Sequence, residues 1–130
     1  MTIYFSVSII SSANAETVDT LSETKAIVAI MMETLKTCED HACTMKFYNQ
    51  YASADLLSKI AESDANTKES MLKAGKPMAV KFLEDIDKFD VSIEKISEDK
   101  VFLVYKAKEV NNKQENKFSF VKINGEWKLG

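Results

Sequence analysis

The chain has 130 residues, of which 45% are hydrophobic and 28% are charged, a balance that excludes a disordered chain and suits one domain of ordinary size. The formal net charge is −3, and every basic residue is a lysine. Because bidentate recognition of phosphate and guanine depends mainly on arginine, this composition argues against a nucleic-acid partner.

The first residues predict an export signal. An apolar run from Ile3 to Ile10 is followed by Ala13-Asn14-Ala15, the A-x-A pattern of a signal-peptide cleavage site, although no lysine precedes the run. The run is too short to cross a bilayer. We therefore expect residues 1–15 to be a signal peptide and residues 16–130 to form one periplasmic or secreted α+β domain without a membrane span. The alternative is a buried strand or short helix over residues 1–15.

The first half of the remaining chain has the spacing of helices. Thr20-Leu21-Ser22-Glu23 has the pattern of a capping box and predicts the start of a helix, which continues with apolar residues at helical spacing to Cys38. A turn at Glu39-Asp40 separates it from a second helix over residues 45–51.

Two shorter helical signals follow. Ser53 precedes apolar residues that predict a third, short helix. Residues 63–67 are polar and predict a loop. Pro77 suits the first turn of a further helix, with apolar residues recurring as far as Phe89.

After Asp90 the apolar period changes to two, which predicts strands. The expected strands begin at Val91, extend over residues 101–110 and 117–123, and end in a hairpin at Asn124-Gly125. Both turn residues tolerate the positive φ of a type I′ turn, which pairs Ile123 with Glu126. Directly opposed residues share a face of the sheet, so the core face is expected to carry four large side chains: Phe118, Phe120, Trp127 and Leu129.

Helices followed by an antiparallel meander that ends in Phe-Val-Lys-Ile-Asn-Gly-Glu-Trp-Lys-Leu (residues 120–129) resemble the nuclear transport factor 2-like superfamily. More narrowly, the chain is similar to exported bacterial domains of unknown function in that group. The resemblance covers residues 20–130 and implies a cone-shaped, cystatin-like α+β fold, with N-terminal helices packed on a curved antiparallel sheet around a cavity. Some members are isomerases, dehydratases or cyclases and others only bind, so fold does not settle function.

The two cysteines predict a disulfide. Cys38 and Cys43 are the only pair, and exported proteins meet an oxidising compartment. In one continuous helix their Cα atoms would lie further apart than the roughly 7 Å that a bridge allows, so the helix has to break between them, at Glu39-Asp40. The alternative is two reduced, buried cysteines.

His41, the single histidine, lies between these cysteines, but C-x-x-H-x-C matches no standard zinc motif. We therefore predict neither a metal nor a catalytic role for His41, and no cofactor for the chain.

Three tyrosines are the candidate ligand-binding residues. Tyr48, Tyr51 and Tyr105 have hydroxyls that would point into a cavity inside the cone, although aromatic residues at such spacings also form plain core. The preferred function is non-catalytic binding of a small apolar ligand or a protein partner. The alternatives are an acid/base enzyme of the isomerase or dehydratase type that uses this cavity, and a structural or assembly role.

Overall fold

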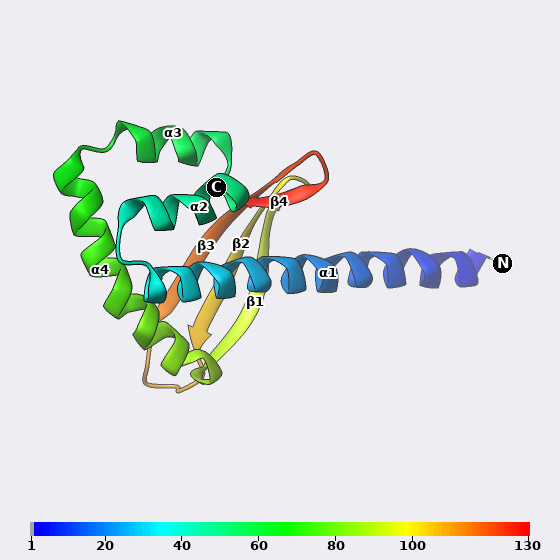
Figure 1. Ribbon diagram of the computed structural model, residues 1–130. Helices are drawn as coiled ribbons and strands as arrows, with labels where there is room; N and C mark the ends of the chain where they lie inside the picture. The colour runs from blue at the N-terminus through cyan, green and yellow to red at the C-terminus, as the bar shows by residue number, and fades with distance from the viewer. Residues whose placement is uncertain (1) are drawn as a thin grey trace.

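In the computed structural model the backbone is described from Thr2 and the side chains from Asp19 to Gly130. The predicted signal peptide, residues 1–15, therefore lies outside the described side chains. Four helices precede a four-stranded antiparallel sheet, which confirms the α+β fold class (Figure 1). The elements are α1 (Thr2–Thr37), α2 (His41–Tyr51), α3 (Ala54–Glu62), α4 (Ala65–Glu84), the 3-10 turn η1 (Ile86–Lys88), β1 (Phe89–Ser97), β2 (Lys100–Ala107), β3 (Glu115–Ile123) and β4 (Glu126–Leu129).

Helix α1 is continuous through the predicted capping box, so a helix start at residues 20–23 is wrong. Thr20 is buried in the helix, and its carbonyl accepts a hydrogen bond of 2.7 Å from the hydroxyl of Thr24. A threonine inside a helix can donate to the carbonyl four residues back, as Thr24 does, so a threonine does not by itself mark a helix start.

The next three helices begin at short polar side chains. Asp40 caps α2 by accepting from the backbone N–H of Cys43 at 2.8 Å, and Ser53 caps α3 by accepting from Leu56 at 3.2 Å. Asp64 caps α4 by accepting from Thr67 at 2.7 Å. These caps satisfy amide groups that have no partner inside the helix. The breaks before α2 and α3 are as predicted.

Pro77 lies inside α4 and not in its first turn, which corrects the predicted helix start. The cap at Asp64 starts the helix earlier, within residues expected to form a loop. Proline removes one backbone hydrogen bond from a helix interior, at a substantial cost in stability. The helix nevertheless continues beyond Pro77, where Ala79 and Phe82 are buried in the core.

The sheet is a meander with the strand order β1-β2-β3-β4. The final hairpin has the predicted register, in which Ile123 pairs with Glu126 and Phe120 pairs with Leu129. Asn124 and Gly125 have φ values of 52° and 81°, as a type I′ turn requires. The predicted long strand over residues 101–110 is shorter, because β2 ends at Ala107.

The main core lies between α1, the second half of α4 and one face of the sheet (Figure 1). Val28 and Met32 of α1 meet Leu103 and Phe120 of the sheet in this layer. Trp127 belongs to the same cluster and is 8% exposed, which confirms the predicted core face. The aromatic rings of this layer contact each other mostly edge to face: Phe82, Phe89, Tyr105 and Phe118.

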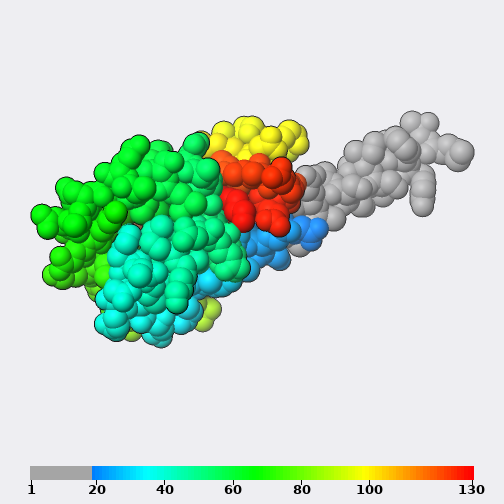
Figure 2. Space-filling view, turned by 45° about the horizontal axis from the view of Figure 1, so that its top comes forward, coloured from blue at the N-terminus to red at the C-terminus, as the bar shows by residue number. Residues whose placement is uncertain are grey.

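The edge of the sheet at β4 is joined to the helical layer. The backbone N–H of Ser53 donates to the carbonyl of Leu129 at 2.7 Å, and Ala52 pairs with Leu129 as a parallel bridge. In Figure 2 β4, in red, lies against the segment that joins α2 to α3. This link places α3 and the start of α4 beyond the sheet, where they surround the site described below.

Candidate functional site

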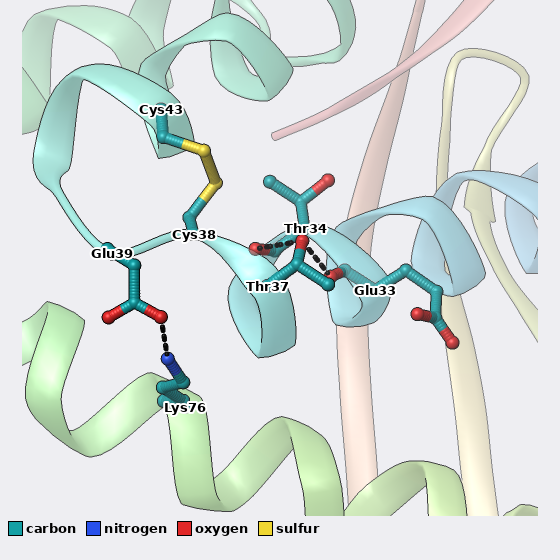
Figure 3. A network of polar contacts seen from close by, with 7 residues as sticks. All are labelled: Glu33, Thr34, Thr37, Cys38, Glu39, Cys43 and Lys76. Carbon is teal, nitrogen blue, oxygen red and sulfur yellow. Dashed lines mark hydrogen bonds and ion pairs between the residues drawn. A yellow bond between two sulfur atoms is a disulfide. The ribbon is translucent and has the colours of Figure 1, made fainter.

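A disulfide forms the corner between α1 and α2. Cys38 and Cys43 are bonded with an S–S distance of 2.01 Å and a Cα–Cα distance of 5.5 Å, which confirms the predicted pair (Figure 3). The helix breaks between them as expected, since α1 ends at Thr37 and α2 begins at His41. The cross-link fixes His41 immediately beside the corner.

An ion pair joins this corner to α4. Lys76 Nζ lies 2.6 Å from the carboxylate of Glu39 (Figure 3). In the last turns of α1 the Thr34 and Thr37 hydroxyls donate back to helix carbonyls, the second to that of Glu33 at 2.9 Å. The Lys76–Glu39 pair is largely exposed, so it contributes little stability and only marks where α4 and the corner come into contact.

A wide groove lies between the corner and one face of α4, and we call it the lysine groove. Its volume is about 1090 Å³. The α4 residues that line it recur every three or four positions, so they lie on one face of the helix. The lining residues are Cys38, Glu39, Asp40, His41, Ala65, Lys68, Glu69, Leu72, Lys73, Lys76, Pro77, Val80, Lys81 and Glu84.

A second hollow, the apolar cavity, lies between α2, α3 and the adjoining face of α4. Its volume is about 490 Å³. It is lined by Leu35, His41, Thr44, Tyr48, Ile60, Ser63, Lys68, Met71, Leu72, Ala74, Gly75 and Met78. The lysine groove and the apolar cavity share His41, Lys68 and Leu72, so these three residues mark the place where the two hollows meet.

Some of the lysines around the two hollows form ion pairs with described side chains and others do not. Three lysines of the groove have carboxylate partners: Lys73 with Glu69 at 3.2 Å, Lys76 with Glu39 at 2.6 Å and Lys81 with Asp85 at 2.9 Å. The Asp85 hydrogen bond raises the pKa of Lys81, and Lys81 in turn lowers the pKa of Asp85. Among the side chains from residue 19 onward, no ion pair includes Lys68.

The structure does not bring the three predicted tyrosines together. Tyr48 lines the apolar cavity, and burial raises the pKa of its hydroxyl. Tyr51 lies on the same helix against the ring of Phe47, with 5.0 Å between centroids, and lines a shallow hollow beside the disulfide. Tyr105 belongs to the core, 4.9 Å from the ring of Phe82, and burial raises its pKa to about 12. Their role in ligand binding stays a prediction.

The residues that line both hollows were not predicted from the sequence to form a site. His41, for which we predicted no catalytic or metal role, lines both hollows. Lys68 and Leu72 are ordinary residues of a charged amphipathic helix, and nothing local distinguishes them from the rest of α4. Their importance depends on which helix faces remain uncovered, which is a property of the whole fold.

Metal ligation is not indicated in the part of the chain whose side chains are described. No group of three or more His, Cys, Asp or Glu residues there is placed to hold an ion, and the two sulfurs are joined to each other. Over the same part of the chain, none of the helices is long and apolar enough to cross a membrane.

Comparisons with family models, with curated proteins and with solved structures give no match for this chain. Its function has to be inferred from its own residues. The arrangement can enclose an apolar group between α2, α3 and α4, and it offers polar contacts at His41, Tyr48 and Lys68.

Proposed function

We propose that this chain is an exported, non-catalytic domain that binds a small apolar ligand in the apolar cavity. The cavity carries this proposal, because its volume of about 490 Å³ and its mostly apolar lining are those of a small-molecule site. A few polar groups among apolar walls orient a ligand without requiring chemistry from the protein.

Exposed methionines at the rim support a ligand that covers them. Met71 and Met78 line the apolar cavity, yet they are 56% and 49% exposed. Large apolar side chains gathered at a hollow mark binding sites, and methionine adapts its shape to different ligands. A bound apolar molecule would remove this surface from water.

Tyr48 favours binding over acid/base catalysis. A phenol is protonated at neutral pH and can donate a hydrogen bond, and burial raises the pKa of this one further. A general base needs a pKa near the working pH, which this shift moves further away. Tyr48 therefore serves to orient a ligand and not to remove a proton from it.

The order of helices and meander supports placing the chain in the nuclear transport factor 2-like superfamily, with one difference in where the ligand is bound. On the core face of the sheet Leu103, Tyr105 and Phe120 are each no more than 1% exposed. Side chains occupy the space where that superfamily's cavity was expected. We therefore place the ligand between the helices and not between the helices and the sheet.

Export is supported by the disulfide together with the A-x-A pattern, since stable disulfides belong to oxidising compartments. N-terminal sequencing of the mature protein should begin at Glu16. Thiol counting in denaturant without reductant should find no free thiol. Mature protein that retains Met1 would contradict the predicted cleavage.

Binding is tested with N-phenyl-1-naphthylamine, a neutral apolar dye whose fluorescence rises in apolar surroundings. The purified chain should bind it, and Ala74→Phe should weaken binding at least tenfold because Ala74 lines the apolar cavity. Ser70→Phe is the matched control, since Ser70 is exposed on the same helix and lines neither hollow.

Circular dichroism should show that both variants keep the fold. Equal dye binding by the two variants, or no dye binding by the unmodified chain, would contradict the proposal. If the chain binds no dye but binds a folded protein, the protein-partner alternative is favoured.

A further inference from the structure

Lys68 differs from the other lysines of α4 in both position and pairing. It is half-buried and is the only lysine that lines both the lysine groove and the apolar cavity. Lys73, Lys76 and Lys81 lie within 3.2 Å of a carboxylate, whereas no ion pair among the described side chains includes Lys68. Lys68 is thus the lysine of the apolar cavity lining, and it has no carboxylate partner among the described side chains.

The lining of the apolar cavity has a positive balance. Its charged residue at neutral pH is Lys68, and the described lining includes no aspartate or glutamate. Lys68 has a small electrostatic effect on Asp64, whose carboxylate already accepts from the backbone N–H of Thr67 at 2.7 Å. An anion at this place would meet a complementary charge without displacing an existing ion pair.

The other polar groups of the cavity divide into occupied and available donors. The hydroxyl of Thr44 donates to the carbonyl of His41 at 2.8 Å, and that of Ser63 donates to Lys59 at 3.3 Å. Tyr48 also lines the cavity, and its phenol is protonated at neutral pH like that of any tyrosine. Tyr48 and Lys68 are therefore donors that an acceptor group can use, and an anionic head group is the strongest acceptor.

We infer that the ligand is an amphiphile with one anionic head group, which Lys68 binds while the apolar tail lies against Met71, Leu72 and Met78. This inference rests on the proposed function and specifies its ligand class. The carboxylate or equivalent anion lies where the two hollows meet. The tail covers the apolar walls between α2, α3 and α4.

The test compares two amphiphiles of equal chain length and opposite charge. Dodecanoate and dodecylamine, each below its micelle concentration at neutral pH, are titrated into the chain loaded with N-phenyl-1-naphthylamine. We expect dodecanoate to displace the dye at concentrations at least tenfold lower than dodecylamine. Added salt should reduce this preference only modestly, because salt screens a partly buried pair less than an exposed one.

Lys68→Met retains the apolar stem of the side chain and removes its charge. This variant should lose most of the preference for dodecanoate, with its own dye affinity, measured by direct titration, as the reference for both displacement curves. Lys73→Met is the matched control, because Lys73 lies on the same helix, lines only the lysine groove and is paired with Glu69. The control should keep the preference.

The two proposals fail in different ways. If the dye binds but the two amphiphiles displace it equally, or if Lys68→Met keeps the preference, the anionic ligand class is wrong and the apolar site stands. If the unmodified chain binds no dye and neither amphiphile, the proposed function is wrong. If Lys68→Met and Lys73→Met lose the preference equally, the selectivity comes from general positive charge on α4 and the assignment to Lys68 is wrong.

Discussion

The two ends of the helical layer differ in how they use apolar residues. Beside the sheet, α1 and the second half of α4 bury theirs in a continuous core that includes Val28, Phe82 and Phe120. At the far end, α3 has no buried residue, and the buried residues of α4 all lie beyond Pro77. The apolar side chains there surround a cavity instead. Burial stabilises the first region, and the incomplete burial of the second leaves room for a ligand.

The largest expected effect is on the packed side. Trp127→Ala removes a large buried side chain and should lower the free energy of unfolding by about 3–5 kcal/mol. Met71→Ala, on the cavity side, should lower it by no more than about 1 kcal/mol because Met71 is 56% exposed. Urea unfolding of both variants measures the difference. Equal losses in the free energy of unfolding for the two variants would show that the two regions are packed alike.

The disulfide should have an intermediate effect. The loop between Cys38 and Cys43 is short, so in the chain-entropy model the bond contributes about 2 kcal/mol. The double variant Cys38→Ala/Cys43→Ala should show this loss in urea unfolding, and reductant should lower the stability of the unmodified chain but not of the variant. If reductant also lowers the stability of the variant, the loss is unrelated to the bond.

Gly75→Ala should stabilise the cavity side. A Cβ atom at Gly75 would lie 3.5 Å from Leu35 Cδ2, an ordinary contact, and alanine favours the helix over glycine by about 1 kcal/mol. We expect a gain of about 0.5–1 kcal/mol in urea unfolding. Gly125→Ala is the contrasting control and should destabilise, because φ is +81° there. A less stable Gly75→Ala would show that Leu35 has no room to accept the methyl group.

The smallest expected effect is a change in how the free energy of unfolding depends on pH. The Thr67 backbone N–H that Asp64 accepts lowers the pKa of Asp64 below 3.8, so the folded chain holds fewer protons on this group than the unfolded chain. Its stabilisation is complete above the unfolded pKa and is lost as the pH falls through the lowered folded pKa. Asp64→Asn keeps a capping oxygen that does not titrate. Between about pH 5 and about pH 2 it should lose less stability in urea unfolding than the unmodified chain. If the free energies of unfolding of the variant and of the unmodified chain change in parallel with pH, Asp64 makes no such contribution.

Local signals in the sequence predicted the parts of the fold that local chemistry decides. Asn124-Gly125 defined the register of the final hairpin, and Cys38 and Cys43 required the helix break that the structure has. The helix starts predicted at Thr20 and Pro77 were wrong, because capping residues and prolines also occur inside helices when tertiary packing holds them there. The candidate site was harder to predict from the sequence than the fold. Lys68 gains its role from three helices that leave one face uncovered, and no short stretch of sequence contains that information.

The link between Ser53 and Leu129 has a consequence for how the chain acquires its structure. The junction of α2 and α3 is completed by a strand that comes after every other element in the chain, so this contact closes a very long loop. Contacts of such high sequence separation are slow to form. A chain that extends only as far as α4 lacks the sheet against which α1 and the second half of α4 bury their apolar residues. Its apolar face therefore stays open to chaperones and proteases until the final hairpin has been made.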